Sequence, residues 1–177
     1  MKRLALLGLL LLAAQPAFAA TGIFQTYVVL DRGAGNVFFE GSGPDNNSTN
    51  PLFESTYFAP TTSGGTFVLK GAEINTFKNG TPDISGTDVT GTQLFYRVTL
   101  LGAAPGTFTQ LNIPFNTNLP IPGDQRWQET AASVDLAALC GVGNVCQLDF
   151  YFRATTNNVE RLDNNGGSNY HVDLPVQ

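Results

Sequence analysis

The sequence predicts an all-β protein, an antiparallel immunoglobulin-like β-sandwich of about eight or nine strands. Its 177 residues include thirteen phenylalanines, nineteen glycines and ten prolines, a composition that favours short strands joined by turns. Beyond the N-terminal segment, no window keeps the apolar spacing of three to four residues that a long helix requires. Several segments instead alternate apolar and polar residues between clusters of glycine, proline, asparagine and aspartate, which is typical of a sandwich.

The N-terminal segment is predicted to be a signal peptide covering residues 1–19. Lys2 and Arg3 precede an apolar run, and Ala17-Phe18-Ala19 places small residues where a signal peptidase cleaves. The run is too short for a membrane-spanning helix, and no later stretch approaches that length. We therefore expect residues 20–177 to form a single secreted domain without a transmembrane segment, located outside the cell, in a periplasm or on the cell surface.

Net charge excludes one class of partner. Nine basic residues face fourteen acidic ones in the full chain, and loss of Lys2 and Arg3 leaves a formal charge of −7. Such a balance repels phosphate backbones, so nucleic-acid binding is not expected.

The strands expected along the chain are short and separated by turns. Their ranges are 23–30, 37–40, 66–70, 72–77, 93–101, 107–114, 147–155 and 170–176. In the first strand, Ile23, Tyr27 and Val29 are the expected inward positions. Gly71 is expected to mark a bulge.

Other segments are less regular. Residues 52–59 suit a strand or an irregular edge, residues 133–139 a short strand or a helical turn, and residues 116–124 a loop between layers.

Cys140 and Cys146 are the only cysteines. In an exported protein a disulfide between them is the default expectation. The bond would close a small loop at the start of the strand that begins at Gln147.

The last two expected strands enclose an unusually long loop, residues 156–169. Asparagine, aspartate and glycine tolerate left-handed backbone conformations, so this run can fold into consecutive tight turns. A hairpin needs fewer residues than this, and long loops on rigid sheets are often functional.

Part of this loop carries a family resemblance. Asp163-Asn164-Asn165-Gly166-Gly167-Ser168-Asn169-Tyr170 follows an aromatic strand and resembles the closing motif of starch- and glycogen-binding modules of family 21, related to families 25 and 26. The resemblance implies an immunoglobulin-like sandwich that binds glucans. Leu162 stands where that motif has tryptophan, so one aromatic plate for a sugar ring is missing.

The predicted glycan site combines amides with an aromatic surface. Sugar hydroxyls bond to planar amides and carboxylates, and the C–H faces of the rings pack on aromatic side chains. The polar contacts are assigned to Asn164, Asn165 and Asn169, with Asp163 bracing the turn. The stacking surface is assigned to Trp127, Tyr151 or Tyr170. The competing interpretation places Trp127 and Tyr170 in the core and uses the amides to cap the loop backbone.

Enzymatic and metal-binding functions find little support. His171 is the only histidine and lies beside Tyr170 in a strand, without a serine-nucleophile motif. The asparagine-rich runs lack the ligand order of a calcium loop. We therefore expect no cofactor, no metal and no catalysis. The predicted function is a secreted carbohydrate-binding module whose partner is a polysaccharide or surface glycan. The alternative is a structural or adhesive cell-envelope protein that binds protein partners, and a hydrolase ranks behind both.

Overall fold

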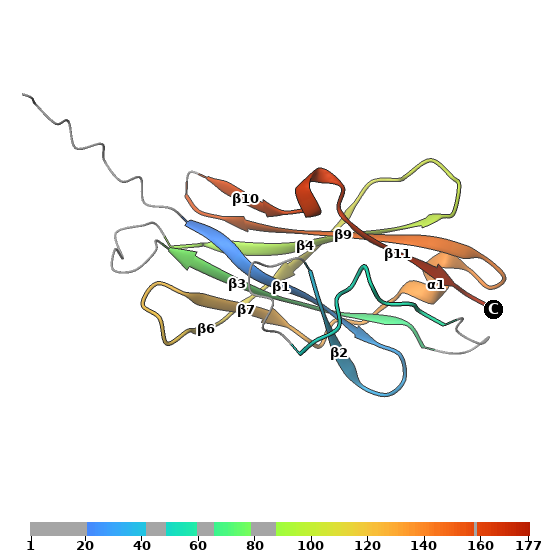
Figure 1. The fold of residues 1–177 in the computed structure, drawn as a ribbon, viewed down its shortest axis with the longest axis horizontal. Helices are drawn as coiled ribbons and strands as arrows, with labels where there is room; N and C mark the ends of the chain where they lie inside the picture. Colours follow the sequence, from blue (N-terminus) through green and yellow to red (C-terminus); the bar gives the residue numbers. More distant parts are fainter. Residues whose placement is uncertain (1–20, 42–48, 60–65, 79–87, 158) are drawn as a thin grey trace, which may run out of the picture.

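The computed structural model describes residues 21–41, 49–59, 66–78, 88–157 and 159–177. Two antiparallel sheets pack face to face as an open sandwich (Figure 1). The all-β sandwich predicted from composition and alternation is therefore confirmed.

The first sheet has six strands in the order β2-β1-β3-β7-β6, with β8 also paired to β3. Its strands are β1 (Thr21–Asp31), β2 (Asn36–Glu40), β3 (Val68–Lys78), β6 (Phe115–Asn118), β7 (Gln125–Glu129) and β8 (Val134–Asp135). The second sheet has the order β10-β9-β4-β5, with β11 also paired to β9. Its strands are β4 (Gly91–Leu100), β5 (Thr109–Ile113), β9 (Val145–Thr155), β10 (Glu160–Asp163) and β11 (Tyr170–Pro175).

The described residues form eleven strands, more than the eight or nine predicted, and the extra ones are short. β6 extends into the expected loop of residues 116–124, and β10 lies inside the expected loop of residues 156–169. All four residues of β6 are exposed, as are three of the four in β10. Without a buried face these edge strands show no apolar alternation, which is why the sequence does not reveal them.

Of the expected inward positions of β1, Tyr27 and Val29 are buried, but only Ile23 packs against the main core cluster. The pairing of β1 with β3 shifts register between Ile23 and Gln25. Beyond this irregularity Val28 and Leu30 join the core cluster, so Tyr27 and Val29 point to the other face of the sheet. A one-residue bulge reverses the faces of every later residue in a strand.

The bulge expected at Gly71 is present. Register between β1 and β3 shifts where Gly71 faces Val29, and Gly71 has a φ of +135°. A Cβ atom there would lie 2.1 Å from the carbonyl oxygen of Glu129. Only glycine fits this close crossing of two strands.

Buried aromatic rings fill much of the space between the sheets. Phe53, Phe58 and Phe67, which lie outside the strands, are at most 1% exposed. Phe58 packs between Phe53 and Phe67, and Phe53 in turn packs against Phe150 of β9. The segment that carries Phe53 and Phe58 therefore closes one side of the sandwich.

A short helix and the disulfide close one end. Helix α1 (Leu136–Cys140) is N-capped by Asp135, whose carboxylate accepts a hydrogen bond from the N–H of Ala138. Cys140 and Cys146 form the predicted disulfide, which joins the end of α1 to the start of β9.

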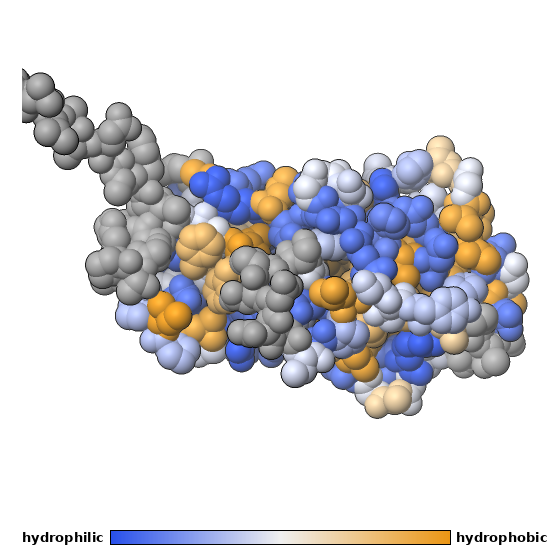
Figure 2. All heavy atoms as spheres, in the orientation of Figure 1, coloured by the Kyte–Doolittle hydropathy of each residue, from blue (hydrophilic) through white to orange (hydrophobic). Residues whose placement is uncertain are grey.

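The same end exposes aliphatic side chains. Leu100, Leu101, Val142 and Val145 are all more than 40% exposed, and Figure 2 shows hydrophobic residues gathered there. None of the helices in the described ranges is long and apolar enough to cross a membrane.

A groove between β11 and residues 54–58

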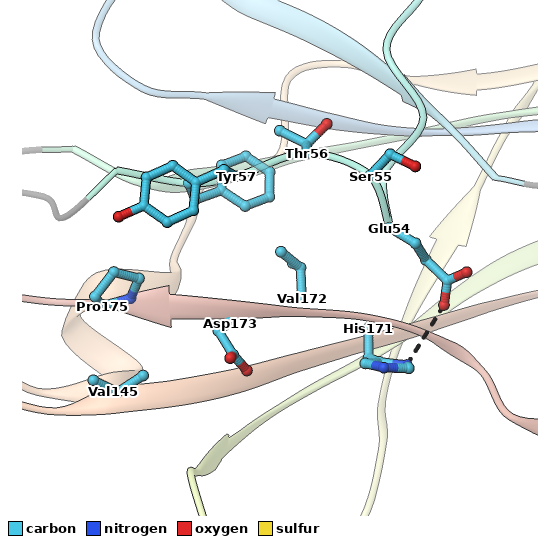
Figure 3. Close-up of a pocket in the computed structure, with 10 residues that line it drawn as sticks. Glu54, Ser55, Thr56, Tyr57, Val145, His171, Val172, Asp173 and Pro175 are labelled. Carbon is cyan, nitrogen blue, oxygen red and sulfur yellow. Dashed lines mark ion pairs between the residues drawn. The ribbon is translucent and has the colours of Figure 1, made fainter.

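An open groove of about 460 Å³ runs along β11 (Figure 3). Residues 54–58 form one wall, and the other wall is formed by Val145, His171, Val172, Asp173 and Pro175. A smaller depression of about 90 Å³ adjoins it, shares Glu54 and Ser55, and reaches Glu40 and Tyr170. Together they form one continuous hollow beside β11.

Two buried rings hold the first wall. Phe53 packs edge-on against Phe150 at 5.0 Å between ring centroids, and Phe58 packs edge-on against Phe67 at 5.1 Å. Between them the N–H of Thr56 bonds to the carbonyl of Phe53, and its hydroxyl bonds to the carbonyl of Leu52. The residues between these anchors are therefore held close to the sandwich edge while their side chains face water.

Tyr57 lies between the anchors, and its ring is 80% exposed. Figure 3 shows this ring above β11, on the groove side of the wall. No other large hydrophobic side chain in the described ranges is as exposed. An aromatic face left in water beside a groove is an ordinary feature of ligand-binding surfaces.

The opposite wall is built from alternate residues of β11. Tyr170, Val172 and Leu174 point inward and are buried, while His171 and Asp173 are exposed. The Nδ1 atom of His171 lies 3.5 Å from Oε1 of Glu54, so these side chains meet across the groove. Asp173 lies two residues further along the same side of the strand.

The edge of β11 also offers backbone groups. Val176 donates its N–H to the carbonyl of Asn144 in the segment before β9. By alternation, Tyr170, Val172 and Leu174 bond to β9, and the N–H and C=O groups of His171 and Asp173 point away from it. Among the described residues, no backbone hydrogen bond reaches these outward groups.

The predicted asparagine cluster lies next to the groove and contacts it through Asn165 and Glu54. The side-chain oxygen of Asn164 accepts from the N–H of Gly167. The amide of Asn165 donates to Glu54 at 2.9 Å and to the carbonyl of Asn169 at 3.3 Å. Asn165 and Asn169 have φ values of 50° and 59°, in the left-handed region. Their amides and backbones shape the turn, and the Asn165 amide fixes Glu54 in the groove.

Asp163 and Tyr170 are joined in the interior. The hydroxyl of Tyr170, a residue only 2% exposed, donates to Oδ1 of Asp163, and the hydroxyl of Thr26 donates to Oδ2. Burial raises the pKa of the Asp163 carboxyl, although hydrogen bonds from Thr26, Tyr170 and the N–H of Asn165 oppose the rise. The Tyr170 ring is therefore part of the core.

The other predicted aromatic residues lie elsewhere. Trp127 is 7% exposed, belongs to β7 of the other sheet and packs edge-on against Phe115. Tyr151 stacks on Phe95 at 4.5 Å on the outer face of the second sheet. The structure thus brings Asp163, Asn164, Asn165, Asn169 and Tyr170 together but not Trp127.

The aromatic residue of the groove was not predicted from the sequence. Tyr57 lies in a segment expected to be a strand or irregular edge. The signal in hindsight is its position between Phe53 and Phe58, since two buried anchors force the intervening ring outward.

Metal-ligating side chains do not converge. In the described part of the chain, no group of three or more histidine, cysteine, aspartate or glutamate residues could hold a metal ion.

Comparison with known proteins does not identify a family for this chain. The chain matches no family model, no curated protein and no solved structure.

Proposed function

We propose that the chain is an exported, non-catalytic carbohydrate-binding protein, and that a polysaccharide lies along β11 in the groove. The observation that carries this proposal is the Tyr57 ring, 80% exposed on the groove wall beside Glu54, His171 and Asp173. A sugar ring needs one apolar face to stack on and several polar groups at its rim. The groove offers both within one surface.

The asparagine loop supports the proposal indirectly. Asn165 holds the carboxylate of Glu54 at 2.9 Å, so the loop orders a polar group that faces the ligand. Glucans are the first ligands to test, because the Asp163–Tyr170 run resembles the closing motif of starch- and glycogen-binding modules. In this arrangement Tyr57 replaces the stacking residue that Leu162 does not provide.

Retention on insoluble polysaccharide tests the proposal. Starch, glycogen, cellulose, chitin and peptidoglycan are compared in parallel with the mature protein. Tyr57→Ala should weaken retention about tenfold, because lost burial of an aromatic face costs about 1.4 kcal/mol, whereas Tyr57→Phe should retain most of it. Ile121→Ala removes a side chain that is 57% exposed outside the groove and serves as the control. Equal retention of Tyr57→Ala and wild type would refute the site.

A second candidate function rests on a separate observation. The outward N–H and C=O groups of His171 and Asp173 are suited to pairing with an extended segment of another protein. In this case the chain is a structural or adhesive protein of the cell envelope, and a partner strand fills the groove.

A further inference from the structure

The charges around the groove are one-sided. Glu54 and Asp173 line it, Glu40 lines the adjoining depression, and neither hollow is lined by lysine or arginine. Among the described residues that line the two hollows, His171 is the only one that can carry a positive charge. The nearby Arg97 forms a 2.6 Å ion pair with the buried Asp149, so its charge is compensated within the sheet.

The carboxylates retain free acceptor capacity. Oε1 of Glu54 takes the amide of Asn165 and lies near His171, while Oε2 has no hydrogen-bond partner among the described residues. Asp173 is exposed on the same side of β11 as His171, roughly 7 Å along the strand. Both carboxylates can accept a proton donor from a ligand without breaking a bond of the fold.

An aromatic face beside carboxylates favours a ligand that carries a protonated amine. A protonated amine forms charge-assisted hydrogen bonds with carboxylates and is attracted to the face of a tyrosine ring. Tyr57, Glu54 and Asp173 line the same groove. An anionic sugar would meet two carboxylates with only His171 to offset their charge and would be repelled.

Resting on the proposed carbohydrate function, we infer that the groove selects glycans with free amino groups, that is, deacetylated amino-sugar polymers, over their neutral and anionic counterparts. Glu54 and Asp173 bind the ammonium groups, and Tyr57 packs against the sugar ring.

Short oligomers of glucosamine and of N-acetylglucosamine provide matched probes, because they share one sugar backbone and differ at the nitrogen, where acetylation removes the charge. Binding is measured by calorimetry in mildly acidic buffer that keeps the amine protonated, together with an oligomer of a uronic acid. We expect the glucosamine oligomer to bind roughly tenfold more tightly than the acetylated one, as one charge-assisted hydrogen bond would give, and the uronic acid oligomer to bind most weakly.

Substitutions test whether the preference for the glucosamine oligomer depends on Glu54 and Asp173. The double variant Glu54→Gln, Asp173→Asn should remove the preference, so that the glucosamine oligomer binds no more tightly than the acetylated one. Glu160→Gln, an equivalent change at an exposed residue outside the groove, should leave the preference intact. A preference that survives the double variant, or falls equally with Glu160→Gln, would overturn the inference as general attraction to an acidic protein.

The remaining outcomes separate the two proposals. Equal binding of both oligomers, abolished by Tyr57→Ala, would refute selection by charge while retaining the carbohydrate function. Binding of an oligolysine peptide with the same dependence on Glu54 and Asp173, without binding of any glycan, would refute both and identify the groove as a peptide site.

Discussion

The hydroxyl of Thr26 donates a hydrogen bond to the carboxylate of Asp163, with Oγ1 and Oδ2 2.5 Å apart. Thr26 belongs to β1 of one sheet and Asp163 to β10 of the other, so this bond joins the two layers. Tyr170 donates to the same carboxylate. The segment that resembles a sugar-binding motif is therefore also part of the joint between the sheets.

The first prediction concerns pH. Because burial raises the folded-state pKa of Asp163 above its ordinary value, the folded protein keeps a proton that the unfolded chain has already released. Between those two pKa values the free energy of unfolding must fall as pH rises. Asp163→Asn should remove this contribution and flatten the curve on the acid side. Urea unfolding from about pH 3 to pH 7 measures it, with exposed Asp173→Asn as the control. A curve for Asp163→Asn that parallels wild type would contradict the prediction.

The second prediction concerns the space around Thr26. A Cβ atom added to Gly41 would lie 2.5 Å from Oγ1 of Thr26 and 3.2 Å from the Tyr170 ring. Gly41→Ala should therefore push these residues apart and cost about 1–3 kcal/mol. Gly106→Ala is the matched control, because no atom lies within 4 Å of its added Cβ. Thermal unfolding compares the two variants, and similar melting temperatures would disprove the close packing at Gly41.

The sequence predicted the features that leave a periodic or chemical signature. Alternation in residues 147–155 and 170–176 located β9 and β11, and the presence of two cysteines in a chain expected to be exported predicted the disulfide. The β1 bulge left no such signature, so the sequence did not show that Val28 and Leu30 join the main core cluster while Tyr27 and Val29, although buried, lie outside it. Local patterns do not show where a ladder shifts, because that depends on the partner strand.

The candidate site was only partly predictable for a similar reason. Asn165 was singled out for its side chain, but its principal contact is Glu54, which lies 111 residues away in the sequence. Tyr57 is exposed because Phe53 and Phe58 are each buried against other strands. The Asn165–Glu54 contact is long-range and leaves no local pattern, whereas the exposure of Tyr57 follows from its position between Phe53 and Phe58 only once the burial of both rings is known.

The third prediction separates the two roles of Asn165, its backbone and its amide. Its φ of 50° strains any residue with an ordinary side chain, and its amide holds Glu54. Asn165→Ala should lose both and destabilise the protein by about 1–2 kcal/mol. Asn165→Gly should restore most of the stability yet still release Glu54, so both variants should lose amine selectivity equally. Asn165→Gly binding like wild type would show that the amide is not needed.

The fourth prediction distinguishes a glycan from a protein strand in the groove. Asp173→Pro removes both the carboxylate and the outward N–H, and Asp173→Asn removes only the carboxylate. Proline is tolerated where an edge strand directs its N–H to solvent, so circular dichroism should show the same fold for both variants. If a glycan binds through the carboxylate, the two variants should lose the preference for the glucosamine oligomer to the same extent. A partner strand would instead require the N–H, and binding would then be lost in Asp173→Pro but retained in Asp173→Asn. That second pattern would show that the groove binds a protein strand and not a carbohydrate, because Asp173→Asn keeps the backbone N–H that Asp173→Pro lacks.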